Sequence, residues 1–185
     1  GANKSLWDRQ IEQLSDTHRI VSCDLRGHGE SDIFSTPYSI EGLATDILYL
    51  LDHLGTHCCH FIGLSLGSMI GLWLGAKSPD RIKRMVLAGA SAKVQDRAAF
   101  DERISQIEER GLPSVFKELD SRWYDDGFST KNPVIVQATR AMVAKTPIDG
   151  YLAATIAVRD FDITAQLTDI EAPMLLITGA NDKAT

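Results

Sequence analysis

The sequence is short of cysteines, of basic residues and of long hydrophobic runs, and each shortage argues against a class of protein. Three cysteines in 185 residues do not make a secreted disulfide framework, which favours a cytoplasmic location. Lys and Arg number 19 against 25 Asp and Glu, so the net charge is -6, and no basic block predicts nucleic acid or an anionic membrane as a partner. The longest apolar stretch, 61–76, is too short and too interrupted to span a bilayer. Residues 1–15 contain no apolar run, so no signal peptide is expected there.

What is present fits an ordinary globular protein, with 44% hydrophobic and 24% charged residues. Short apolar runs predict strands at residues 19–23, 60–64, 84–88 and 174–178. Helical periodicity predicts helices over 41–54 and 66–77, the first with Ser39 as N-cap and Gly55 as its stop. Strands that alternate with helices predict an α/β fold, with a mostly parallel sheet and helices on both faces.

The stretch 93–162 differs, because it is charged, mostly helical in pattern and free of convincing strands. We interpret it as a helical cap inserted into an α/β core, so that 1–92 is the first part of the core and 163–185 its return. A run of surface helices is the alternative. The expected apolar stripes are Phe100, Ile104 and Ile107, then Val115, Leu119 and Trp123, then Ile135 and Met142.

Residues 63–67 read Gly-Leu-Ser-Leu-Gly, which fits the G-x-S-x-G pattern. An apolar strand before it and an apolar helix after it predict a nucleophile elbow, with Ser65 on a sharp turn and Gly63 and Gly67 giving clearance. The serine then stands at a helix N-terminus, where the Leu66 N–H can stabilise an oxyanion. The alternative is a glycine-rich turn with an idle serine. The glycine spacing excludes a dinucleotide-binding loop.

In an elbow of this kind the acid and then the histidine follow the serine along the chain. Asp182 comes after the last predicted strand and a glycine turn, so it is the candidate acid, against the alternative of an exposed loop aspartate. No histidine follows it. The five histidines all precede Ser65, at positions 18, 28, 53, 57 and 60, so chain order excludes them as the base. His28 is expected to shape the rim of the cleft.

Two other clusters carry weaker hypotheses. Residues 57–60 read His-Cys-Cys-His, but four consecutive residues at a strand entrance point to alternating sides and cannot surround a metal ion. Asp125 and Asp126 lack the alternating oxygen ligands of a calcium loop and are expected to form a solvated turn.

With these motifs in place, the chain resembles the α/β-hydrolase superfamily over nearly its whole length. The matching segments are 24–31, 63–67 and 173–179 together with Asp182. Within the superfamily it is most similar to 3-oxoadipate enol-lactonases, on the spacing of Gly1 and Trp7 and on segments 73–76, 121–123, 146–151 and 157–162. The resemblance also implies that the oxyanion loop before Gly1 and the last strand with its histidine are missing, so we expect a fragment that is inactive alone.

The resemblance implies that Ser65 attacks the carbonyl of an enol-lactone in the breakdown of aromatic compounds, and that water then releases 3-oxoadipate. It implies no metal and no organic cofactor. Since such a substrate carries a carboxylate, Arg122 or Arg159 is expected to bind it, with Trp123 as an apolar wall, against the alternative of solvated arginines. A general carboxylesterase, a C–C hydrolase and a non-catalytic ligand receptor remain as alternatives, and the oligomeric state is left open.

Overall fold

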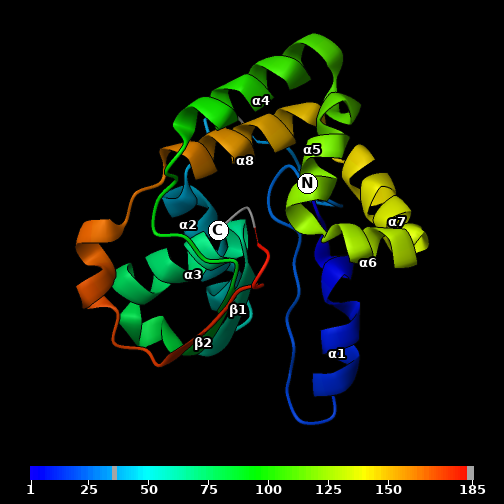
Figure 1. The fold of residues 1–185 in the computed structure, drawn as a ribbon. Coiled ribbons are helices and arrows are strands. Elements are labelled where there is room, and N and C mark those ends of the chain that lie inside the picture. Colours follow the sequence, from blue (N-terminus) through cyan, green and yellow to red (C-terminus); the bar gives the residue numbers. More distant parts are fainter. Residues whose placement is uncertain (35–36, 183–185) are drawn as a thin grey trace. The chain divides into compact units, whose positions relative to one another are not determined.

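The computed structural model describes residues 1–34 and 37–182 of the chain (Figure 1). In chain order the helices are η1 (Lys4–Trp7), α1 (Asp8–Leu14), α2 (Ile40–His53), α3 (Leu66–Lys77), η2 (Pro79–Arg81), α4 (Arg97–Arg110), η3 (Leu112–Val115), α5 (Phe116–Trp123), α6 (Asp126–Lys131), α7 (Pro133–Ala144), α8 (Ile148–Asp160) and η4 (Thr164–Asp169). The strands are β1 (Cys59–Leu64), β2 (Ile82–Ala88) and β3 (Met174–Ile177).

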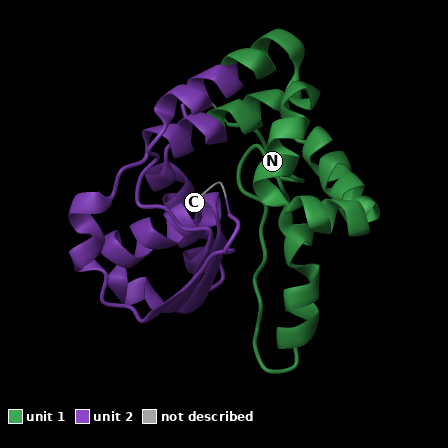
Figure 2. Cartoon of the chain, viewed as in Figure 1, with its two compact units in different colours: residues 1–36, 105–153 green, residues 37–104, 154–185 purple. Residues whose placement is uncertain are grey.

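The chain divides into two compact units, which Figure 2 colours separately. Unit 1 contains residues 1–36 and 105–153, and unit 2 contains residues 37–104 and 154–185. Residues 35–36 and 183–185, including the end of the predicted return of the core, lie outside the described residues. The units do not coincide with the segments 1–92, 93–162 and 163–185, and that division of the chain stays a prediction.

Unit 2 contains a parallel sheet with the strand order β1-β2-β3, as the alternation of strands and helices predicted. The strands share one register at their carboxyl ends, because Leu64 pairs with Ala88 and Ala88 pairs with Ile177. The predicted strands 60–64, 84–88 and 174–178 are therefore confirmed to within two residues. The side chains of β3 stay open to solvent, since Leu175 and Leu176 are 57% and 61% exposed.

Helix α3 connects β1 to β2 and packs on one face of both strands. Its bounds, Leu66–Lys77, are those predicted. The helix approaches the sheet closely through two glycines one turn apart. A Cβ on Gly71 would lie 2.6 Å from the Leu87 side chain, and one on Gly75 would lie 2.8 Å from the Met85 side chain. These close contacts hold the middle and the end of α3 against the sheet.

Helix α2 packs against α3 and begins where the sequence indicated. The Ser39 hydroxyl accepts a hydrogen bond of 3.0 Å from the Gly42 N–H, which satisfies one of the unpaired donors of the first turn. Leu43 and Leu51 are buried, as the predicted apolar face required. Gly55 follows the helix and has a φ of 62°. This left-handed conformation commonly ends a helix, and glycine adopts it most easily.

Residues 19–23 are not a strand, contrary to the prediction. Val21 is 47% exposed, and the sheet formed by the described residues contains only β1, β2 and β3. An apolar run becomes a strand only when a neighbouring strand supplies its ladder of hydrogen bonds. The prediction of a strand at residues 19–23 was therefore wrong, because local composition does not supply the partner strand.

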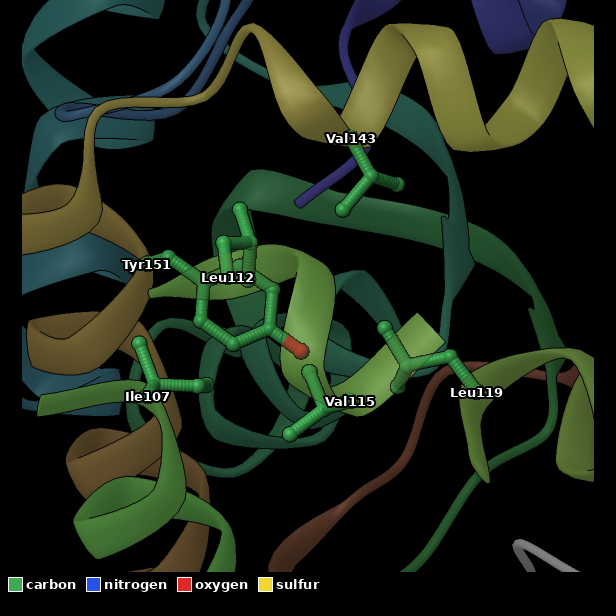
Figure 3. Close-up of a cluster of buried hydrophobic side chains, with 6 residues drawn as sticks. All are labelled: Ile107, Leu112, Val115, Leu119, Val143 and Tyr151. Carbon is green, nitrogen blue, oxygen red and sulfur yellow. The ribbon is translucent and has the colours of Figure 1, made fainter. Parts of the chain in front are cut away.

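Unit 1 has a helical core formed by six side chains that point toward one another (Figure 3): Ile107, Leu112, Val115, Leu119, Val143 and Tyr151. The predicted stripe of Val115, Leu119 and Trp123 fails at its last member, since Trp123 is 42% exposed. In α7 the buried residues are Val136 and Val143 rather than Ile135 and Met142. None of the described helices is long and apolar enough to cross a membrane.

Candidate functional site

The turn between β1 and α3 holds Ser65 in a strained conformation. Its φ of 52° and ψ of -111° make it the one non-glycine residue with positive φ in the described part of the chain. A side chain in such a region costs about 1–3 kcal/mol, which the surroundings must offset. The Ser65 N–H donates to the carbonyl of Ala88 on β2 at 2.8 Å, and the side chain is exposed.

The two glycines of the pentapeptide differ in their surroundings. A Cβ on Gly63 would lie 2.3 Å from the carbonyl oxygen of Gly67 and 2.8 Å from the Ser68 nitrogen, both backbone atoms that cannot turn aside. A Cβ on Gly67 would meet no described atom within 4 Å apart from its chain neighbours and the backbone of its own helix. The expectation that both glycines provide clearance is therefore supported for Gly63 and contradicted for Gly67.

Ser65 precedes the first residue of α3, and its side chain makes no capping hydrogen bond to the helix. The first N–H groups of a helix have no partner within it and carry a partial positive charge. The Leu66 N–H is the first of them, directly beside the Ser65 hydroxyl in the chain. This arrangement can hold a negative oxygen that forms one bond away from the serine.

Asp182 lies at the same edge of the sheet as Ser65. Ser65 directly follows β1, Asp182 follows β3 by five residues, and the two parallel strands end level with each other on either side of β2. Neighbouring strands are about 4.8 Å apart, so the ends of β1 and β3 are about 10 Å apart. The Asp182 N–H donates to the Gly179 carbonyl at 3.0 Å, which closes a tight turn after β3. A histidine side chain placed between the two loops can bridge a gap of this size.

His57 and His60 lie at the far end of β1 from Ser65. His60 is at the amino end of β1, five residues before Ser65, and therefore about 16 Å from it along an extended strand. His57 precedes that strand, and His18 belongs to unit 1. His28, also in unit 1, is 4% exposed, and its Nε2 has no hydrogen-bond partner. Burial lowers the pKa of His28 to about 4, so the ring is neutral at pH 7.

The arginines that the sequence offers for a substrate carboxylate have different partners. Arg159 on α8 donates from Nη1 to Asp101 at 2.7 Å and from Nη2 to Asp160 at 2.8 Å. The pKa of Asp160 is lowered by that hydrogen bond from Arg159. Arg122 on α5 lies 3.6 Å from Glu118, one helical turn away, beyond the usual range of a hydrogen bond. Arg122 and Trp123 belong to unit 1, whereas Arg159 and Ser65 belong to unit 2.

The two weaker clusters have structural explanations. Within residues 1–34 and 37–182 no group of three or more His, Cys, Asp or Glu side chains could hold a metal ion. Burial raises the pKa of the Cys59 thiol, which opposes the thiolate that a metal site needs. Asp125 is the N-cap of α6 and accepts a hydrogen bond of 2.8 Å from the Gly127 N–H. The acidic pair thus starts a helix, where a solvated turn was predicted.

Sequence reasoning selected the loop 24–31 but missed the role of Asp24 within it. The Asp24 side chain is 3% exposed, and its carboxylate accepts the backbone N–H groups of Lys4 at 2.6 Å and Glu30 at 3.0 Å. A Cβ on Gly29, where φ is 56°, would lie 2.2 Å from that carboxylate. Asp24 therefore ties the loop to the start of η1. The signal in the sequence was an aspartate followed by two glycines.

The second residue that sequence reasoning missed is Ser68, on the first turn of α3. It is 0% exposed, although it is polar and lies in an apolar helix. Its hydroxyl oxygen is 2.9 Å from the Gly63 carbonyl oxygen and 2.7 Å from that of Ala88. A serine within an apolar run was the available signal, but sequence alone does not reveal these partners.

Known proteins share this fold over the whole chain. The protein family described as alpha/beta hydrolase fold matches residues 1–185. The curated protein 3-oxoadipate enol-lactonase 2 of Acinetobacter baylyi is 34% identical over 185 residues, which are 100% of this chain and 69% of that protein.

Two solved structures are similar in the same way. A hydrolase from Pseudomonas aeruginosa is 37% identical with a TM-score of 0.94, and the match covers 100% of this chain and 70% of that one. An enol-lactonase from Burkholderia xenovorans is 30% identical with a TM-score of 0.95, and the match covers 99% of this chain and 70% of that one. These relatives are longer than the 185 residues, in line with the expected incompleteness of the fold.

Proposed function

The chain belongs to the alpha/beta hydrolase fold family, and we propose that it is a serine hydrolase of carboxylic esters or lactones whose substrate is the enol-lactone of 3-oxoadipate. The reaction belongs to the cytoplasmic breakdown of aromatic compounds and needs no metal and no organic cofactor. The similarity to an enol-lactonase of Acinetobacter baylyi supports the choice of substrate.

The observation that carries the proposal is the backbone of Ser65, with φ 52° and ψ -111° at a strand–helix junction. Strain of this kind persists where the surroundings hold it, and it is concentrated at functional sites. A serine that only closed a turn would be replaced without loss by glycine, which adopts positive φ at no steric cost. We therefore infer that the strained backbone is kept because this position needs the serine side chain, which glycine lacks.

In the proposed reaction the Ser65 hydroxyl attacks the lactone carbonyl carbon, and the Leu66 N–H stabilises the oxygen that becomes negative. Asp182 orients the histidine that takes the serine proton, and in this fold that histidine follows the acid along the chain. No histidine follows Asp182 in these 185 residues. Collapse of the tetrahedral intermediate breaks the ring C–O bond, and the histidine gives its proton to the leaving enol oxygen. Water then hydrolyses the acyl-enzyme, which releases the open-chain acid and restores the Ser65 hydroxyl.

An arginine recognises the carboxylate of the substrate in this proposal. Arg122 is the better candidate, because its contact with Glu118 at 3.6 Å leaves its donors available for a bidentate pair. Arg159 is the second candidate, and it would have to exchange its hydrogen bonds to Asp101 and Asp160 for the substrate. The adjacent Trp123, 42% exposed, offers an apolar surface.

The test compares hydrolysis of the enol-lactone and of p-nitrophenyl acetate by the complete gene product and by its Ser65→Ala variant. We expect the variant to lose on the order of 10³-fold or more in kcat on both substrates. Ser78→Ala is the matched control, since Ser78 lies at the other end of α3, and it should keep full activity. Tight binding of the lactone without turnover by the unmodified protein would instead indicate a ligand receptor.

A further inference from the structure

Ser68 lies one helical turn beyond Ser65 and is the buried polar side chain nearest to it in the chain. A serine inside a helix commonly bonds to a carbonyl three or four residues earlier in the same helix. The Ser68 hydroxyl instead reaches two carbonyls outside α3, those of Gly63 at 2.9 Å and Ala88 at 2.7 Å. Because a hydroxyl has one hydrogen, the two carbonyls share it.

These two carbonyls belong to the backbone on either side of the elbow. Gly63 is on β1, the strand that enters the turn, and Ala88 ends β2, the neighbouring strand. The Ala88 carbonyl also accepts the Ser65 N–H at 2.8 Å. One carbonyl oxygen therefore joins the backbone of Ser65 to the side chain of Ser68, and the Ser68 hydroxyl links both strands to the helix that leaves the turn.

We propose that Ser68 is a positioning residue for the nucleophile, and that its hydroxyl holds the Ala88 and Gly63 carbonyls where they keep Ser65 in its strained conformation. The inference rests on the proposed function, in which Ser65 is the nucleophile. A strained residue stays in place only when several contacts fix it, and the Ser68 hydroxyl supplies two contacts to the backbone on either side of the turn. Without the hydroxyl, the turn relaxes and the Ser65 oxygen spends less time in its reactive position.

A different role is possible for a small buried side chain in this place, namely to let α3 approach the sheet as Gly71 does. The two roles make opposite predictions for Ser68→Ala. Alanine keeps the small volume and removes only the hydroxyl, so a packing role predicts unchanged catalysis. The positioning role predicts slower chemistry with unchanged substrate binding.

The experiment measures kcat, KM and the rate of labelling by a fluorophosphonate for the complete gene product and its Ser68→Ala variant, with p-nitrophenyl acetate as substrate. We expect kcat and the labelling rate to fall about tenfold, equivalent to about 1.4 kcal/mol, while KM stays within about twofold. Ile70→Val is the matched control. Ile70 is 1% exposed on the same helix and lies outside residues 63–67, so the variant loses packing but no hydrogen bond of the elbow and should keep its kcat.

The inference is overturned if Ser68→Ala keeps its kcat. It is also overturned if Ile70→Val and Ser68→Ala lose the same thermal stability and the same amount of kcat. Failure of the proposed function gives a different result, because Ser65→Ala would then stay active or the label would attach to another residue.

Discussion

Gly63 and Gly67 flank Ser65 symmetrically in the sequence, and the structure predicts opposite results when each is changed to alanine. In Gly63→Ala the new Cβ would lie 2.3 Å from the Gly67 carbonyl oxygen, where ordinary contact begins at 3.4 Å. The first turn of α3 would have to move by about 1 Å, since both groups belong to the backbone. Overpacking of this kind costs about 1–3 kcal/mol of unfolding free energy. A displacement of about 1 Å at a nucleophile costs about 100-fold in rate.

Gly67→Ala adds the same methyl group in open space within a helix, where alanine is about 0.5–1 kcal/mol more favourable than glycine. The assay is denaturant unfolding of both variants of the complete gene product, together with the rate at which a fluorophosphonate labels Ser65. We expect Gly63→Ala to lose stability and reactivity, and Gly67→Ala to gain slight stability and keep its labelling rate within about twofold. Equal damage by the two substitutions, or none by Gly63→Ala, would refute the steric reasoning about the turn.

Three further predictions concern Ser65, His28 and the arginines. Ser65→Gly should raise the unfolding free energy above that of Ser65→Ala by about 1 kcal/mol or more in denaturant titrations, because glycine relieves the strain at φ 52°; equal stabilities would contradict the strain. The pKa of His28 is lowered to about 4 from an ordinary 6.5, so the unfolded chain takes up the proton first as the pH falls. The contribution of His28 to the free energy of unfolding is therefore complete above about pH 6.5 and is lost as the pH falls to about 4. The loss amounts to about 3 kcal/mol. Unfolding curves of His28→Gln measured across this pH range should lack it. Arg122→Ala should raise KM for a lactone that carries a carboxylate and not for its neutral ester, whereas Arg159→Ala should change both alike; equal losses in Arg122→Ala would argue against carboxylate recognition.

Elements whose pattern is local could be predicted from the sequence. The helix over 66–77 has the predicted bounds, and the strands on either side of it are correct to within two residues. Each is a continuous apolar segment with a glycine, proline or capping residue at its end, so neighbours in the chain contain the information. The same reasoning selected Ser65 as the residue of interest.

Features that depend on distant partners could not be predicted in this way. Residues 19–23 have the composition of a strand, but pairing depends on a neighbour that local sequence does not specify. On α7 the predicted pair Ile135 and Met142 and the buried pair Val136 and Val143 have the same spacing of seven residues. Periodicity does not tell which of two adjacent apolar columns faces the core.

Within the site, the same limit applies to side chains that contact other strands. The pattern G-x-S-x-G treats its two glycines alike, whereas only Gly63 faces backbone atoms across the turn. The role of Ser68 depends on Ala88, twenty residues away in sequence. One of the two ion pairs of Arg159 is with Asp101, 58 residues away, and the other is with the adjacent Asp160. The proposed nucleophile has a local pattern in the sequence, whereas the groups that contact its turn are distant in the chain.

The central claim is that Ser65 is a nucleophile, and covalent labelling tests it most directly. The complete gene product is incubated with a fluorophosphonate, digested and mapped by mass spectrometry, with heat-denatured protein as control. We predict one adduct, on Ser65, in the folded protein only, and none in Ser65→Ala. An adduct on another serine, or equal labelling of folded and denatured protein, would contradict the claim.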